Sequence, residues 1–155
     1  MGIWSYTKTF NHLTKLDAGG TALQSTSHGL YFLAEQTLLE PLSIFLRYGI
    51  ANADVNRFQS NIAYGFVFNG LIPTRDLDRF GVAVTTVTNG AEYKTQQATA
   101  GAQVDDSETA VEFTYKVQLY RGIAIQPDFQ YVIHPSTITT RENALVGLLR
   151  FEVEL

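Results

Sequence analysis

Apolar and polar residues alternate most regularly between Glu108 and Pro135. From Val111 to Leu119 every odd-numbered position is apolar, and the positions between them are Glu112, Thr114, Lys116 and Gln118. A second alternating run extends from Ile123 to Ile133, after a break at Arg121 and Gly122. Alternation with period two is typical of a β-strand with one apolar and one polar face, and the glycine-containing break predicts a β-hairpin. Each strand has about 10 residues, enough to cross a bilayer when tilted by about 45°.

The same rhythm predicts eight strands in the whole chain. The strands outside this hairpin are expected at residues 2–6, 28–38, 42–51, 58–71, 79–88 and 144–155. Residues 7–27, 52–57, 89–107 and 135–143 are expected to be loops, and residues 39–41, 72–78 and 121–122 turns. No segment shows a helical period that competes with this assignment. Short turns then alternate with mostly longer loops, so the expected fold class is all-β: an antiparallel, up-and-down transmembrane β-barrel.

Composition narrows the function. The net charge is −4 without a basic bias, so no nucleic-acid partner is expected. The absence of cysteine excludes disulfides and thiolate metal sites. A mean hydropathy near zero is compatible with a membrane barrel, because the polar lumen face offsets the apolar face. Residues 1–4 lack the features of a signal peptide, so we expect a mature chain, a fragment or a protein that stays in the cytoplasm.

Catalytic chemistry has no support in the sequence. His12, His28 and His134 are expected in or beside loops, without the spacing of metal ligands. There is no nucleophile elbow, no phosphate-binding loop and no cysteine nucleophile. We therefore expect neither an enzyme nor a bound cofactor or metal ion.

Three motif-bearing segments carry a resemblance to a known family. Residues 44–84 contain Gly-Leu-Ile-Pro-x-Arg, residues 108–135 contain Gln-Pro-Asp-x-Gln-Tyr, and ALVGLLRFEVEL closes the chain. Together they resemble the C-terminal half of carbohydrate-selective porins of the OprB type, over roughly Tyr31 to Leu155. The resemblance implies an outer-membrane barrel of about sixteen strands that lets sugars diffuse inward, of which this chain supplies about eight. Leu155 stands where such proteins usually have a terminal aromatic residue.

The polar positions of the strands are the candidate pore-lining residues. The residues that alternate with the apolar positions and so fall on the inward side are Arg47, Glu112, Lys116, Asp128, Gln130, Arg150 and Glu152. Inside a water-filled barrel, such side chains can form weak hydrogen bonds with sugar hydroxyls while solvent keeps them hydrated. The alternative is that they form cross-strand ion pairs within the wall or simply face water.

The expected protein is a segment of an outer-membrane porin in a Gram-negative cell, with residues 1–155 forming a single barrel segment and no second domain. It would let sugars and other small solutes diffuse passively, without a cofactor. The expected partners are carbohydrate solutes and outer-membrane lipid, with a second copy of the chain or a missing N-terminal half completing the barrel. Two alternatives remain open. One is a small closed barrel of eight strands whose lumen is filled by side chains, and the other is a soluble lipocalin-like binder with its apolar face inside.

Overall fold

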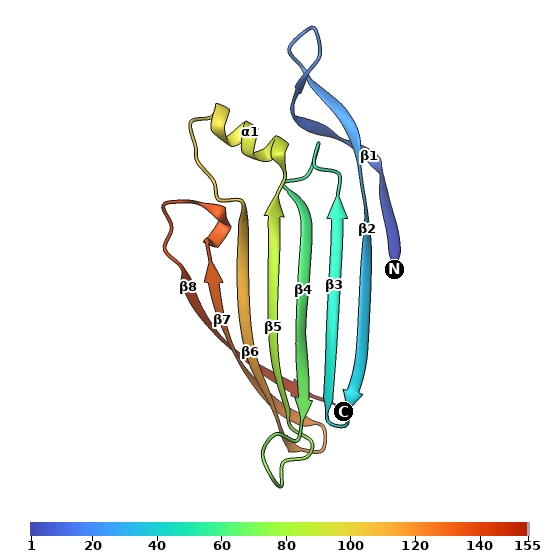
Figure 1. Cartoon of the computed structure of the whole chain (residues 1–155), viewed down its shortest axis with the longest axis vertical. Coiled ribbons are helices and arrows are strands. Elements are labelled where there is room, and N and C mark those ends of the chain that lie inside the picture. The colour runs from blue at the N-terminus through green and yellow to red at the C-terminus, as the bar shows by residue number, and fades with distance from the viewer. Residues whose placement is uncertain (155) are drawn as a thin grey trace.

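The computed structural model describes residues 1–154, which form one antiparallel sheet of eight strands (Figure 1). The strands are β1 (Gly2–Leu16), β2 (Ala22–Leu39), β3 (Leu42–Ala51), β4 (Phe58–Asn69), β5 (Arg79–Asn89), β6 (Ser107–Tyr120), β7 (Ile123–Ile133) and β8 (Ala144–Val153). Each strand pairs with its neighbours in chain order. Within residues 1–154 no ladder joins β1 to β8, so the sheet is open and these strands form its two edges. The all-β, up-and-down prediction is confirmed.

The connections separate into two groups at opposite ends of the strands (Figure 1). Residues 40–41, 70–78 and 121–122 form the turn end, where the C-terminus also lies. Residues 17–21, 52–57, 90–106 and 134–143 form the loop end, which carries the helix α1 (Ala91–Thr99) and the 3₁₀ turn η1 (Pro135–Thr137). The predicted asymmetry of short turns and longer loops is therefore present. Within residues 1–154, no helix has the length and apolar composition needed to cross a membrane.

The register assigns every strand residue to one of two faces, because directly paired residues point to the same side. One row across the sheet reads Ile44, Phe66, Val82, Phe113 and Phe129. We call the side of this row the apolar face. Its rings are not enclosed in a core, since Phe113 is 48% exposed and Phe129 57% exposed. The lipocalin-like alternative required the opposite arrangement, with these rings inside.

The opposite side, which we call the polar face, is the more crowded one. Asp128, Ala63 and Ala124 all point to this face, and all three are buried. Among the described residues, the two alanines are the only buried hydrophobic ones, so the sheet has no conventional apolar core. Side chains converge on the concave side of a curved sheet and spread apart on the convex side. The burial pattern therefore places the polar face on the concave side, as in a barrel wall with a wet lumen.

The predicted loop at residues 7–27 is wrong. β1 continues to Leu16 and β2 begins at Ala22, so the two strands form a ribbon that extends beyond the other strands at the loop end (Figure 1). The register between β1 and β2 shifts twice, between Ser5 and Thr9 and between Asn11 and Leu16. Each irregularity interrupts the alternation of faces, which is the signal that the sequence prediction used.

The absence of a helix was also predicted wrongly. α1 lies within the expected loop at residues 89–107. It has no buried residue, and the residue at its N-cap position, Gly90, makes no capping hydrogen bond through a side chain. An apolar stripe and a capping residue are the usual sequence signals of a helix, and α1 has neither. At the other end of the chain β8 stops at Val153, and Leu155 lies outside the described residues.

Candidate solute-facing wall

The register places all seven candidate pore-lining residues on the polar face. Glu112 pairs with Gln130, Lys116 with Arg79, and Arg150 with Gln126. Six of the seven lie on β6, β7 and β8, and only Arg47 lies apart, on β3 between Leu33 and Ala63. The candidates therefore form one cluster and one separate position. Their contact with a solute stays a prediction.

Hydrogen bonds and one ion pair connect the side chains of the cluster. Lys116 forms an ion pair with Glu152, and Gln130 donates from Nε2 to Oε2 of Glu112 at 3.0 Å. Gln126 donates to Oγ1 of Thr114 at 2.8 Å. Gln126 and Thr114 were not among the predicted residues, although strand parity already placed them on the same face. Lys116 and Glu152 form a cross-strand ion pair within the wall, which was the predicted alternative to contact with a solute.

Asp128 differs from the other members of the cluster because it is only 6% exposed. Within the described residues its Oδ1 atom has no hydrogen-bond partner. With Gln126 and Arg150 it lines a hollow of about 220 Å³. Asp128 therefore lies at the bottom of this hollow, close to the backbone of the sheet. The longer side chains of Gln126 and Arg150 line its sides.

Arg47 is exposed, like Arg150. Its guanidinium lies 3.5 Å from the carboxylate of Glu35 on β2 and 5.4 Å from the centre of the Phe45 ring. Both charged side chains are more than half exposed, so this pair is hydrated and contributes little to stability. Glu35 was missed by the sequence prediction, although its spacing from Leu33 gives it the same parity.

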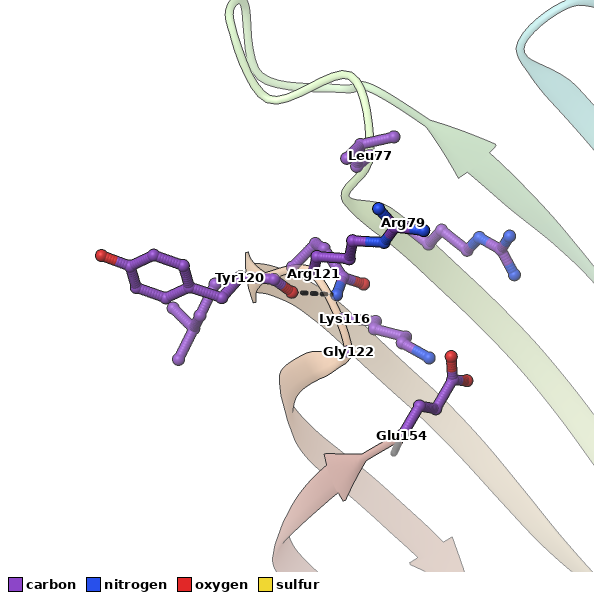
Figure 2. Close-up of a pocket in the computed structure, with 9 residues that line it drawn as sticks. Leu77, Arg79, Lys116, Tyr120, Arg121, Gly122 and Glu154 are labelled. Atoms are coloured by element: carbon purple, nitrogen blue, oxygen red, sulfur yellow. Dashed lines mark hydrogen bonds between the residues drawn. The ribbon is translucent and has the colours of Figure 1, made fainter.

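A larger hollow of about 770 Å³ lies at the turn end (Figure 2). Its charged lining residues are Arg79 of β5, Lys116 of β6, Arg121 of the β6–β7 turn and Glu154, which follows β8. Figure 2 shows the charged ends of Arg79, Lys116 and Glu154 on one side of the strands, and the ring of Tyr120 on the other. Three of these charged side chains are positive and one is negative, so the hollow is polar with an excess of positive charge.

The turn at residues 70–78 is anchored by a buried carboxylate. Asp78 accepts hydrogen bonds from Nε and Nη2 of Arg75 at 2.8 and 3.0 Å, from the Tyr115 hydroxyl at 2.8 Å and from the Gln118 N–H at 2.9 Å. The hydrogen bonds from Arg75 are the main cause that lowers the pKa of Asp78, and they outweigh the opposing effect of burial. The cluster holds the turn against β6 and has no free group for chemistry.

A second polar cluster ties the loop end together. Arg57 donates to the carbonyl of Ser136 at 2.6 Å and to Oγ1 of Thr137 at 2.9 Å, and its guanidinium also stacks on the rings of Phe58 and Tyr93. Asn89, which is fully buried, donates to the Asp105 carbonyl at 2.9 Å and to Oγ1 of Thr137 at 2.8 Å. These bonds join loops that are far apart in sequence and hold them over the end of the sheet.

The β1–β2 ribbon is fastened to the same end through His12. Its Nδ1 accepts backbone N–H bonds from Thr14 and Lys15 at 3.3 and 3.2 Å, and its Nε2 lies 3.1 Å from Asp54. Gln96 of α1 donates to the Leu13 carbonyl at 3.0 Å. His12 therefore lies in a strand and not in a loop. Among residues 1–154, no group of three or more His, Cys, Asp or Glu side chains is arranged to hold a metal ion.

An open antiparallel sheet with an exposed apolar face, a charged concave face and turns at one end is the wall of a membrane β-barrel of the porin class. The family model for carbohydrate-selective porins of the OprB family matches residues 4–155. The chain belongs to this family. Family membership also places it in the outer membrane of a Gram-negative bacterium.

A solved structure supports the fold. The chain is similar to OprB from Pseudomonas putida, in a structure determined at high pH, with a TM-score of 0.85 and 18% sequence identity. The similarity covers 97% of this chain and 43% of that chain, so the present chain spans less than half the length of the solved protein. No curated protein matches the chain.

Proposed function

We propose that this chain forms the C-terminal half of a porin through which sugars and other small solutes diffuse down their gradients. The observation that carries the proposal is the separation of faces over the register of the whole sheet, together with the match to the carbohydrate-selective family. Lipid covers the apolar face, and the polar face lines an aqueous path. No cofactor takes part, because diffusion needs none.

The seven candidate residues give the path a mixed charge. Arg47, Lys116 and Arg150 supply positive charge, and Glu112, Asp128 and Glu152 supply negative charge, with the Gln130 amide among them. Paired charges on the wall attract water and hydroxyl groups without attracting one sign of ion strongly. Each contact is weak, and a solute can leave as readily as it enters.

The edges of the sheet indicate how the barrel is completed. β1 and β8 have no partner strand on their outer sides within residues 1–154. Unpaired backbone N–H and C=O groups in a bilayer cost several kcal/mol each, so both edges need further strands. We propose a barrel of about sixteen strands, in which β1 and β8 pair with an N-terminal half or with a second copy of this chain. The small closed barrel of eight strands is not favoured, because β1 and β8 do not meet.

Reconstitution tests the function. The outer-membrane protein that carries this chain is purified and incorporated into planar bilayers and liposomes. We expect stable ion conductance and swelling of the liposomes in iso-osmotic glucose. Arg47→Glu should shift the ion selectivity toward cations, whereas Arg141→Glu, at an exposed position of a loop, should shift it less. Bilayers that stay sealed after confirmed insertion, or channels that conduct ions and exclude glucose, would overturn the proposal.

A further inference from the structure

The polar face is not charged along its whole width. On β1, β2 and β3 it carries three aromatic side chains, and each stands opposite a glycine of the next strand. Trp4 pairs with Gly29, Tyr31 with Gly49, and Phe45 with Gly65. This part of the concave wall therefore carries aromatic rings beside the Arg47–Glu35 pair, whereas the part formed by β6, β7 and β8 carries charged side chains and amides.

Glycines allow these rings to lie close to the backbone: Gly29 lies under Trp4, Gly65 under Phe45, and Gly2 of β1 under Tyr31. A Cβ atom on Gly29 would come within 2.7 Å of the Trp4 ring, and a Cβ on Gly65 within 2.8 Å of the Phe45 ring. A ring that lies over a backbone presents its opposite face to the solvent. Tyr31 remains 49% exposed on the wet side of the wall, where a large apolar side chain has no packing partner from the described residues on its open face.

The aromatic side chains continue along the β1–β2 ribbon toward the loop end. The ring of Tyr6 packs edge-on against Trp4, with their centres 5.5 Å apart, and against Phe10, with centres 5.8 Å apart. Phe10 pairs with Ser25, which has the same parity as Gly29. An aromatic path therefore leads from outside the sheet to Trp4 and Tyr31.

A hollow of about 340 Å³ lies where this path reaches the wall. Trp4 and Tyr31 line one side, Asn61 and Val87 line the other, and Gly49 lies between them. A Cβ atom on Gly49 would meet nothing closer than 3.8 Å, so the missing side chain leaves space. The volume lies in the range of small-molecule sites, and none of the residues that line the hollow is charged.

The chemistry of the hollow suits one class of ligand. A pyranose ring has a face of C–H groups, which are attracted to the negative face of an aromatic ring, and hydroxyls around its edge. Those hydroxyls can bond to the amides of Asn61 and Gln59, which also line the hollow. Ions and phosphorylated ligands need charged partners, and the hollow offers none.

We propose that the hollow around Gly49 is a pyranose-binding site at the loop end of the channel, and that the rings of Phe10, Tyr6 and Trp4 lead a sugar into it. The site rests on the proposed function, because it requires the polar face to line the solute path. Binding is weak, since a solute that is held tightly would block the channel.

Two variants test the site in the outer-membrane protein that carries this chain. Tyr31→Ala removes one stacking face, and Gly49→Leu fills the hollow without removing any aromatic ring. Tyr64→Ala is the matched control, because Tyr64 is also 49% exposed but lies on the apolar face. Trp4 lines the hollow, and the part of the emission change that is lost in Trp4→Phe of the same protein reports binding there. The probe is D-glucose, compared with mannitol, which has a similar size but no ring.

We expect saturable changes in Trp4 emission and in channel current with D-glucose, and none with mannitol. The concentration for half-saturation should rise about three- to tenfold in Tyr31→Ala, the loss expected for one aromatic contact. Gly49→Leu should lose saturation while it still conducts ions, and Tyr64→Ala should behave as the wild type.

If the wild type passes glucose and neither Tyr31→Ala nor Gly49→Leu changes the glucose concentration for half-saturation, the proposed binding site is contradicted. The proposed porin function is then unaffected. The same holds if mannitol saturates as glucose does. If both variants fail to fold while Tyr64→Ala folds, the hollow is a docking surface for the rest of the barrel, and the proposal is likewise overturned. A wild type that passes no sugar contradicts the proposed function itself.

Discussion

The buried carboxylate of Asp78 is the strongest single anchor at the turn end, and Asp78→Asn tests it. The substitution preserves the shape of the side chain but removes its charge and replaces one acceptor oxygen with an NH₂ group. If Oδ1 keeps its bond to the Gln118 N–H, the new NH₂ group faces Nε of Arg75, which can only donate, and the Tyr115 hydroxyl, which must turn to accept. The Arg75 donor then meets a donor in a site where Asp78 is only 2% exposed.

The size of the effect follows from this environment. Breaking a buried ion pair by removing one partner costs about 3–5 kcal/mol, because the other charge is left without compensation. Arg75 lies partly in solvent, with 37% of its side chain exposed, and it can bind water after the substitution. We therefore expect Asp78→Asn to lower the free energy of unfolding by about 3 kcal/mol, at the lower end of that range.

The pH dependence gives a second measurement. Folding lowers the pKa of Asp78, so the folded protein binds this proton less readily than the unfolded chain. The stabilisation is complete above the ordinary carboxyl pKa of about 4 and is lost as the pH falls through the lower folded value. The difference in stability between the wild type and Asp78→Asn should therefore narrow below about pH 4.

Urea unfolding in detergent micelles at pH 7 and pH 3 measures both effects. Asp76→Asn is the matched control, since it makes the same change in charge at an exposed position two residues away. We expect Asp76→Asn to unfold as the wild type does at both pH values. The reasoning is refuted if the two variants unfold alike at pH 7, or if the cost of Asp78→Asn is the same at pH 3 as at pH 7.

Three further substitutions test other parts of the fold. Phe129→Lys places a charge on the apolar face and should cost about 2–4 kcal/mol on folding into lipid vesicles, whereas Gln130→Lys on the polar face should fold normally; equal costs would contradict the assignment of faces. Gly65→Ala should cost about 1–3 kcal/mol in urea unfolding, because its Cβ would lie 2.2 Å from a carbonyl oxygen of β5. Gly49→Ala, with no contact under 3.8 Å, should stay near the wild type, and equal stability of the two would argue against the close approach at Gly65. Asn89→Ala removes three hydrogen bonds that tie the loops, so amide exchange around α1 and η1 should increase, and unchanged protection would show that other contacts hold them.

Strand positions and faces are the features that the sequence predicts best. The strands Leu42–Ala51 and Ile123–Ile133 have the bounds that alternation predicts. All seven candidate residues lie on one face, because parity within a strand is a local property. Alternation fails where the backbone is irregular, as in the β1–β2 ribbon, and it does not detect a helix that has neither an apolar stripe nor a capping side chain, as in α1.

The contacts between side chains could not be predicted, because they depend on the register between strands. Lys116 and Glu152 are 36 positions apart, and only the pairings of β6 with β7 and of β7 with β8 bring them together. The same holds for Tyr31 opposite Gly49. The burial of Asp78 depends on a strand that follows it by some forty residues. A single sequence contains these residues but not their distances.

The alternation of faces also constrains how such a wall changes over generations. A substitution at one strand position alters either the lipid contact or the solute contact, and leaves the other untouched. An inserted or deleted residue would reverse every later position in the strand and place charges against lipid. Sequence drift is therefore tolerated while strand lengths are not, which accounts for a TM-score of 0.85 at only 18% identity. Changes in length should accumulate in the four connections of the loop end.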